Sequence, residues 1–262
     1  MKLSISNIAW NKELDIGVYD LMKKYGFTGL EIAPTRIFSE TPYGHNEEAK
    51  QWAERLKKDY GFVIPSMQSI WFGRQEKLFG SAEERNNLIE YTNKAIDFAS
   101  VIGCKNLVFG CPKNRNKPEN ASDSIAYGFL NSIGDYAYSK KIKIGVEANP
   151  AIYGTNYLNT TEEAIKLIKA VPSKGLGLNL DFGTIIQNSE SLDVLENNIT
   201  FISHVHISEP YLSEIRHRKL HAELARMLKS NGYAGFVSVE MKSGLALEKI
   251  SEIMGYVKET FE

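Results

Sequence analysis

The sequence contains little cysteine and no long apolar segment. Cys104 and Cys111 are its only cysteines, too few for a disulfide framework, and no histidine lies near them in the sequence. We therefore expect both to be packing residues. No apolar run approaches the roughly 18 residues of a membrane-spanning helix. The first ten residues also lack a charged leader, an apolar core and a cleavage site. These absences favour a cytoplasmic protein without a membrane partner.

The chain also lacks an excess of either charge. Its 31 Lys and Arg residues and 32 Asp and Glu residues give a formal net charge of -1. Nucleic-acid binding depends on clustered positive charge, so the balance predicts no nucleic-acid partner.

No G-x-G-x-x-G turn follows the first expected strand, and its absence disfavours an open dinucleotide-binding sheet. Instead, one unit recurs along the chain: an amphipathic helix, a glycine or turn, then a short apolar strand. The pattern predicts eight strands, at residues 3–10, 29–34, 63–69, 106–112, 143–150, 176–183, 203–210 and 236–242. Crossover helices make such strands parallel. We therefore predict a single (β/α)8 TIM barrel over residues 1–262.

The last four expected strands alternate apolar and polar residues, and the apolar set is expected to face the helices. The opposite parity points Glu147, Asp181, His206 and Glu240 into the barrel. A turn signal follows each of them closely, which places them at equal depth at the carboxyl ends of the strands. This end carries the active site in TIM-barrel enzymes. His204 lies one layer deeper and is expected to be a hydrogen-bonded floor residue.

Three carboxylates that converge in one barrel mouth repel one another and lose hydration. A divalent cation resolves this conflict. Two Glu, one Asp and one His form an O3N ligand set that suits Mn2+, Mg2+ or Co2+, with Zn2+ as a further candidate. The alternative is that each residue makes an isolated hydrogen bond at its strand end.

The four strand ends read GVEANP, LNLDFG, HVHISEP and VSVEMK. With these segments the chain resembles the xylose isomerase-like barrels, the group of sugar phosphate isomerases/epimerases and AP endonuclease family 2. The ligand pattern is most similar to ketose 3-epimerases. The resemblance implies that the quartet binds one divalent metal ion. It also implies that Glu147 and Glu240 are catalytic and move a proton beside a carbonyl through a metal-stabilised enediolate.

The chain departs from the 3-epimerase pattern at three positions. Thr184 stands where that group has a substrate-contacting His, Tyr153 where it has a Glu, and Leu212 where it has an Arg. A free ketohexose is therefore not assigned as the substrate. The third and fourth strands also lack the histidines of the endonuclease IV branch, which argues against DNA cleavage.

Further polar and aromatic side chains near the strand ends are candidate substrate contacts. They are Glu31, Trp10, Gln68, Trp71, Asn149, His221 and Lys113. Lys113, and Arg115 beside it, could hold a phosphate or carboxylate. The alternatives are core packing for the tryptophans, a solvated loop for Lys113, a turn for Asn149 and a structural role for His221. His45 and His217 are expected at the surface.

The leading hypothesis is a metal-dependent sugar or sugar-phosphate isomerase or epimerase, acting on a small-molecule sugar or sugar derivative. A dehydratase of the inosose or dehydroshikimate type starts with the same proton abstraction, and His221 could then protonate the leaving hydroxyl. A non-catalytic carbohydrate-binding barrel is a third hypothesis. The family resemblance also suggests a homodimer or homotetramer.

Overall fold

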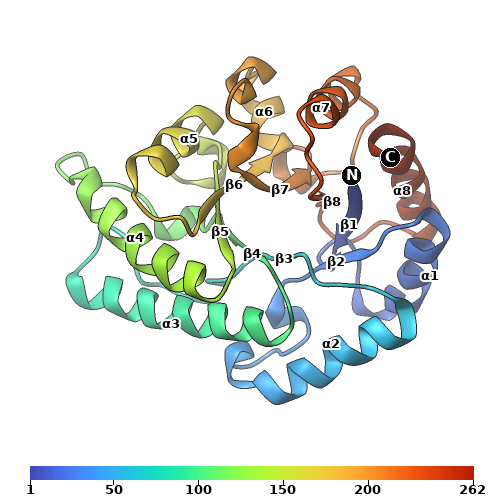
Figure 1. Ribbon diagram of the computed structural model, residues 1–262, viewed down its shortest axis with the longest axis horizontal. Helices are drawn as coiled ribbons and strands as arrows, with labels where there is room; N and C mark the ends of the chain where they lie inside the picture. Colours follow the sequence, from blue (N-terminus) through green and yellow to red (C-terminus); the bar gives the residue numbers. More distant parts are fainter.

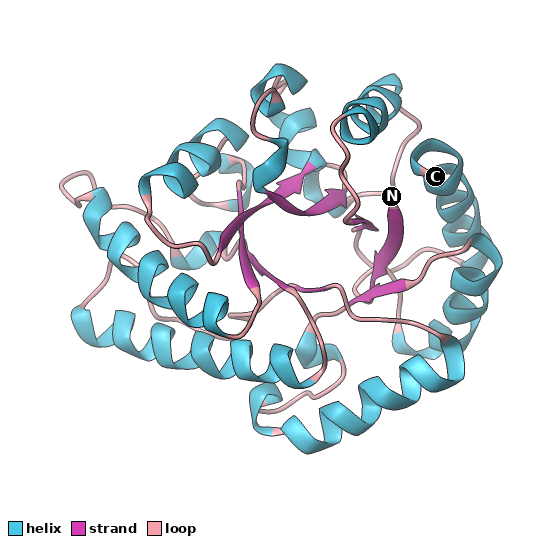
Figure 2. Cartoon of the chain, viewed as in Figure 1, coloured by secondary structure: helices cyan, strands magenta, loops and turns pink.

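Eight parallel strands form a ring inside a layer of helices in the computed structural model, which describes residues 1–262 (Figures 1 and 2). The strands are β1 Lys2–Ser6, β2 Gly29–Glu31, β3 Ser66–Met67, β4 Asn106–Phe109, β5 Lys143–Glu147, β6 Leu176–Asp181, β7 Ile202–Ile207 and β8 Phe236–Val239. The main helices are α1 Asp15–Tyr25, α2 Asn46–Tyr60, α3 Ala82–Val101, α4 Asp123–Ser139, α5 Thr161–Ala170, α6 Phe182–Asn188, α7 Lys219–Ser230 and α8 Leu247–Phe261. None of these helices combines the length and apolarity needed to cross a bilayer.

The strand order is β2-β1-β8-β7-β6-β5-β4-β3, and every neighbouring pair is parallel. Two isolated parallel bridges, Gly29 to Val63 and Ile32 to Met67, link the β2 and β3 segments and close the ring. The structure therefore confirms the predicted (β/α)8 barrel.

Helix ends follow their local sequence. Ser81 begins α3 and Thr160 begins α5, each with a capping box completed by Glu84 or Glu163. These reciprocal hydrogen bonds satisfy backbone N–H groups that the first helical turn leaves free. Gly26 ends α1 in the left-handed conformation, which costs glycine little. Helices α3 and α5 thus begin where side chains cap the backbone, and α1 ends where a glycine adopts the left-handed conformation.

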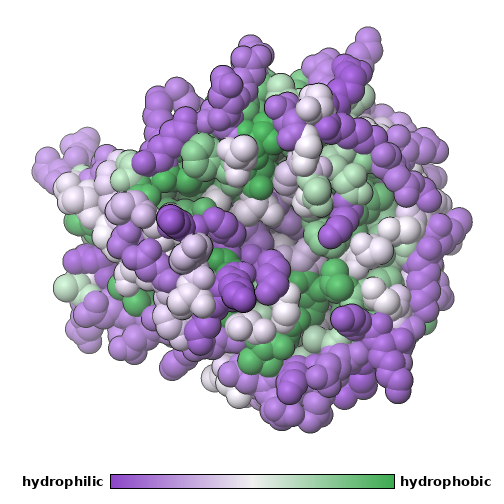
Figure 3. All heavy atoms as spheres, viewed as in Figure 1, coloured by the Kyte–Doolittle hydropathy of each residue, from purple (hydrophilic) through white to green (hydrophobic).

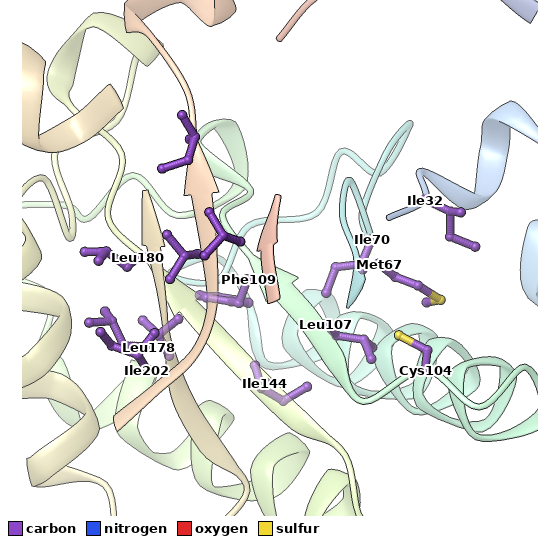
Figure 4. Close-up of a cluster of buried hydrophobic side chains, with 14 of the residues drawn as sticks. Ile32, Met67, Ile70, Cys104, Leu107, Phe109, Ile144, Leu178, Leu180 and Ile202 are labelled. Carbon is purple, nitrogen blue, oxygen red and sulfur yellow. The ribbon is translucent and has the colours of Figure 1, made fainter. Parts of the chain in front are cut away.

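The main core lies between the strands and the helices (Figure 4). The apolar parity of β5 to β8 faces this layer, and Ile144, Leu178 and Leu180 are fully buried there. The predicted alternation is thus confirmed. Cys104 is a free cysteine in this core, whereas Cys111 is half-buried and free. Hydrophilic side chains cover the periphery, with hydrophobic atoms visible between them (Figure 3).

One predicted helix is wrong. The recurring unit predicts a helix before the seventh strand, where residues 191–202 have a helical apolar pattern, but these residues form two short 3-10 turns, η6 Leu192–Leu195 and η7 Ile199–Phe201. The crossover helix is α6, which follows β6 without a loop. The Asp181 carboxylate caps α6 by accepting a hydrogen bond from the Thr184 backbone N–H at 2.9 Å. A strand-end residue can thus begin the next helix, which the periodic pattern alone does not reveal.

Candidate metal centre

The predicted quartet converges at the carboxyl ends of consecutive strands. Glu147 and Asp181 are the last residues of β5 and β6, His206 lies near the end of β7, and Glu240 follows β8 directly. All four side chains are buried. The His206 Nδ1 atom lies 3.0 Å from Glu147 Oε1 and 3.2 Å from Glu240 Oε2. Donor atoms of Glu147, Asp181 and His206 all lie within 4.8 Å of one another.

The equal depth expected for these residues is wrong in detail. Asp181 and His206 are register partners, but Glu147 pairs with Asn179, two residues before Asp181. His206 in turn pairs with Ser238, two residues before Glu240. Strands in a barrel are tilted and staggered. Residues at the ends of neighbouring strands therefore need not be paired with each other in the sheet. The long glutamate side chains span the resulting offset.

Hydrogen bonds hold two of the three carboxylates firmly. Asp181 accepts hydrogen bonds from Ser208 Oγ and from Thr184 Oγ1, the latter at 2.7 Å. Glu147 Oε1 accepts from Asn179 Nδ2 at 2.7 Å, and its Oε2 accepts from Asn149 Nδ2 at 3.0 Å. These donors fix the direction in which each carboxylate offers its remaining lone pairs.

Glu240 differs from the other two carboxylates because no hydroxyl or amide group donates to it; the one side chain that pairs with it is His206. Burial, together with the charges of Glu147 and Asp181, raises the pKa of Glu240 to about 7 despite the opposing charge of His206. Burial and the charge of Glu147 also raise the pKa of Asp181. The sequence predicted which carboxylates meet but not this difference in their hydrogen bonding.

Glu31 lies behind His206, at the end of β2, and is fully buried. Its Oε1 atom is 2.9 Å from His206 Nε2, and its Oε2 accepts a hydrogen bond from Ser238 Oγ at 2.8 Å. Burial alone would raise the pKa of Glu31, but the charges of His206 and His204 hold it well below its ordinary value. Glu31 therefore contacts the ring edge opposite the quartet and does not line the cavity described below.

His204 occupies the layer below His206, and both rings point into the barrel. The ring centres are 5.3 Å apart, and His204 Nε2 lies 3.5 Å from Glu31 Oε1. Burial lowers the pKa of His204, although Glu31 opposes the shift. Its contact with Glu31 at the barrel floor agrees with the place that the sequence predicts for it.

A cavity of about 490 Å3 opens beside the quartet, and Glu147, Asp181 and Glu240 form part of its lining. Four predicted substrate contacts lie on its walls: Gln68, Trp71, Asn149 and Lys113. The side chains of three are already engaged in hydrogen bonds. Gln68 Nε2 donates to Ser6 Oγ at 2.6 Å, Trp71 Nε1 donates to Thr92 Oγ1 at 2.8 Å, and Asn149 bonds Glu147 and Arg115. Their remaining surfaces face the cavity.

Two other predicted contacts lie away from the cavity. Trp10 is buried and donates from Nε1 to Asp15 Oδ1 at 2.7 Å. His221, at the start of α7, is buried with its Nδ1 2.8 Å from the Tyr256 hydroxyl. Burial lowers the pKa of His221 to about 4. The structure therefore does not bring Trp10 or His221 together with the quartet.

Arg115 is fully buried and makes no ion pair. It donates to the Glu147 carbonyl at 2.8 Å and to Asn149 Oδ1 at 3.0 Å. It therefore braces the end of β5 and is unavailable to a substrate anion. Sequence reasoning missed this bracing role, and it missed Asn179 and Ser208 as supports of the quartet. For Asn179, the inward parity that it shares with Asp181 was an available signal.

The family comparison agrees with the fold. Residues 19–260 match the model of a protein family described as xylose isomerase-like TIM barrel. An uncharacterized protein of Methanocaldococcus jannaschii is 30% identical over 137 residues, covering 49% of this chain and 46% of the relative. The chain is thus matched to just under half the length of that curated relative.

Several solved structures have the same fold. D-psicose 3-epimerase from Clostridium cellulolyticum H10 superposes with a TM-score of 0.80 at 13% identity, over 100% of both chains. A 3-keto-D-glucoside 4-epimerase from E. coli gives a TM-score of 0.75 at 18% identity, over 99% of both chains. An IOLI protein described with a binding zinc atom gives 0.68 at 19% identity, over 100% of this chain and 95% of that one. At these identities the likeness shows the fold.

Proposed function

Because the chain belongs to the xylose isomerase-like TIM barrel family, we propose that it is a divalent-metal-dependent sugar or sugar-phosphate isomerase or epimerase. The observation that carries this proposal is the buried quartet, in which Glu240 has no fixed hydrogen-bond donor and faces a cavity. Two similar structures are named as epimerases, which supports a reaction of this class.

The donor set fits a divalent cation. Around an ion with bonds of about 2.1 Å, neighbouring ligand atoms lie roughly 3 Å apart. The 3.0 and 3.2 Å separations from His206 Nδ1 to the two glutamates have this size. Glu147, Asp181, Glu240 and His206 would hold Mn2+, Mg2+ or Co2+, and Zn2+ also accepts these ligands. Such a cation stabilises negative charge on substrate oxygens.

The two glutamates have suitable properties for proton transfer. Glu240 has no hydroxyl or amide donor on its oxygens, so an oxygen not bound to the cation would be open to take up and return a proton. Glu147 sits on β5, three strands away in the ring, and Asn149 and Asn179 fix its two oxygens. A sugar carbon held between them could lose a proton to one carboxylate and regain one from the other. Return to the same carbon from the opposite face gives epimerisation, and delivery to the neighbouring carbon gives isomerisation.

The dehydratase alternative is less well supported by the geometry. Elimination requires a general acid directed at a leaving hydroxyl, and His221 was the sequence-based candidate. His221 does not line the cavity, its Nδ1 contacts Tyr256, and its lowered pKa leaves the ring neutral at pH 7. The isomerase or epimerase reaction needs no such additional acid, because the two glutamates would carry the proton.

Solvent hydrogen exchange tests the proposal. The Mn2+-loaded chain is incubated in D2O with a panel of ketoses and their phosphates, and deuterium at the carbon beside the carbonyl is followed by NMR. Exchange is expected with at least one sugar and is expected to be lost in Glu240→Gln. The matched control is Glu248→Gln, which changes an exposed glutamate on α8. Binding without exchange across the panel would instead support a carbohydrate-binding barrel, and an unchanged rate in Glu240→Gln would remove its acid–base role.

A further inference from the structure

Arg115 is a buried cation beside the metal centre. It follows the 3-10 turn Pro112–Asn114, is fully buried, and forms an ion pair with no carboxylate. Burial lowers its pKa to about 10, so the guanidinium is still protonated at pH 7. An unpaired charge is costly to bury unless hydrogen bonds satisfy it. The role of Arg115 therefore lies in the groups that accept its hydrogen bonds.

The guanidinium joins three segments at the carboxyl ends of the strands. Its Nη1 atom donates to the carbonyls of Phe109 at 3.4 Å and Glu147 at 2.8 Å, the last residues of β4 and β5. Its Nη2 atom donates to Asn149 Oδ1 at 3.0 Å and to the Leu158 carbonyl, before α5, at 3.2 Å. A lysine carries its donors on one atom and cannot reach acceptors spread along a planar fork. These contacts therefore require arginine.

Asn149 is held so that its amide can have only one orientation. Its backbone N–H donates to the Leu158 carbonyl at 2.9 Å, and its carbonyl accepts from Asn159 Nδ2 at 2.8 Å. Because Arg115 offers donors alone, the amide oxygen faces it, and the amide nitrogen donates to Glu147 Oε2 at 3.0 Å. Linked hydrogen bonds polarise one another, so the guanidinium makes Asn149 a stronger donor to Glu147.

Asn149 and Glu147 also have little room to turn away from each other. A Cβ atom at Gly110 would lie 2.7 Å from Glu147 Oε2 and 3.3 Å from Asn149 Oδ1. The space beside the two side chains therefore admits no further group from β4. Asn149 lines the cavity, but Arg115 and Glu147 engage the two ends of its amide. These contacts favour a supporting role for Asn149 over the substrate contact that the sequence predicts.

We propose that Arg115 is a positioning residue of the metal centre and acts on Glu147 through the Asn149 amide. Arg115 does not line the cavity, so it has no contact with a substrate there. The amide holds Glu147 Oε2, while Oε1 stays 3.0 Å from the ligand atom His206 Nδ1. The effect on cation binding follows from this geometry alone, whereas the effect on turnover rests on the proposed function.

A double-mutant cycle on Mn2+ affinity is the first test. Arg115→Lys keeps the positive charge and removes the fork, so its effect reports the fork and not the repulsion between two cations. Asn149→Ala removes the amide. Competition with a fluorescent chelator is expected to show an affinity about tenfold lower in each single variant. If Arg115 acts through Asn149, the double variant binds Mn2+ within twofold of Asn149→Ala.

Two outcomes of the cycle would overturn the proposal: losses that multiply in the double variant, or an unchanged affinity in a folded Arg115→Lys chain. Circular dichroism of the EDTA-treated proteins checks the fold. The matched controls are Arg55→Lys on α2 and Asn87→Ala on α3, which make the same changes at exposed positions. Both controls are expected to bind Mn2+ as the parent does.

Hydrogen exchange tests the fixed amide without a variant and without a metal. In the EDTA-treated parent chain, 1H–15N NMR is expected to show the Asn149 amide protons and the Arg115 Nη protons exchanging at least tenfold more slowly than those of Asn87 and Arg55. Equal rates for the buried and exposed groups would overturn the proposal, even if Arg115→Lys failed to fold.

Kinetic parameters separate positioning from substrate contact. At saturating Mn2+, Arg115→Lys and Asn149→Ala are expected to lower the kcat of solvent exchange about tenfold, with KM within twofold of the parent. A raised KM in Asn149→Ala with unchanged Mn2+ affinity would make Asn149 a substrate contact and overturn the proposal. Absence of exchange with every sugar would count against the proposed function, while chelator competition and hydrogen exchange would still test Arg115.

Discussion

Replacing Glu31 by glutamine tests whether this buried carboxylate orients the histidine ligand. In the parent chain, one Glu31 oxygen faces His206 Nε2 at 2.9 Å, and the other accepts from Ser238 Oγ at 2.8 Å. Although burial opposes the shift, the charges of Glu240 and Glu31 raise the pKa of His206 well above its ordinary value, so the ring carries a proton on both nitrogens. A bound cation would replace the Nδ1 proton, and Glu31 would keep the other proton on Nε2 and the Nδ1 lone pair directed at the site. Glutamine has similar volume but no negative charge, so its oxygen attracts the His206 Nε2–H less strongly, and its amide nitrogen forces the Ser238 hydroxyl to accept instead of donate.

The expected cost follows from these contacts. A hydrogen bond to a charged group contributes about 1.5–3 kcal/mol, and loss of a partner behind a ligand histidine lowers metal affinity by roughly 10- to 100-fold. We therefore expect Glu31→Gln to weaken Mn2+ binding by about 10- to 100-fold, and Glu31→Asp to recover part of this loss. The carboxylate is not in the cavity lining, so the KM of a substrate at saturating metal is expected to change little.

Competition with a fluorescent chelator measures the affinity, and circular dichroism of the chelated protein checks that the variant folds. Glu13→Gln, at an exposed position between β1 and α1, is the matched control. An Mn2+ affinity within twofold of the parent in a folded Glu31→Gln chain would refute the orienting role. An increase in KM at saturating metal would instead support the substrate contact predicted from the sequence.

Three further predictions concern the same centre. Thr184→Val removes the hydroxyl donor to Asp181 Oδ2, and chelator competition is expected to show the Mn2+ affinity lowered about tenfold. An unchanged affinity would show that Thr184 does not support Asp181 as a ligand. Because the pKa of Glu240 is raised to about 7, a cation must displace a proton from it below that pH. Isothermal titration is expected to show the Mn2+ affinity falling from pH 8 to pH 6, and an affinity independent of pH would contradict this expectation. Gly110→Ala places a Cβ 2.7 Å from Glu147 Oε2, so kcat/KM is expected to fall by about 100-fold with little change in melting temperature, whereas full activity would show that the segment can shift.

Much of the fold was predictable because it repeats. Alternation of apolar and polar residues indicated which face of β5 to β8 carries chemistry, and the eight units indicated the barrel. The limits have physical causes. A periodic apolar pattern over residues 191–202 resembles a helix, but the crossover begins at Asp181, whose carboxylate caps α6. Strand stagger is likewise a property of the closed ring, so neighbouring depths could not be obtained from single strands.

Glu31 and Glu240 show why residue type and strand position do not determine a role. Each is a buried glutamate at the carboxyl end of its strand. Glu31 meets His206 at Nε2, away from the cavity, and the nearby histidine charges hold its pKa low. Glu240 meets the same ring at Nδ1, on the cavity side, where burial and two neighbouring carboxylates raise its pKa. His206 thus separates a glutamate suited to remaining ionised from one suited to exchanging a proton. That division depends on which edge of one imidazole each strand reaches, and only the assembled barrel determines it.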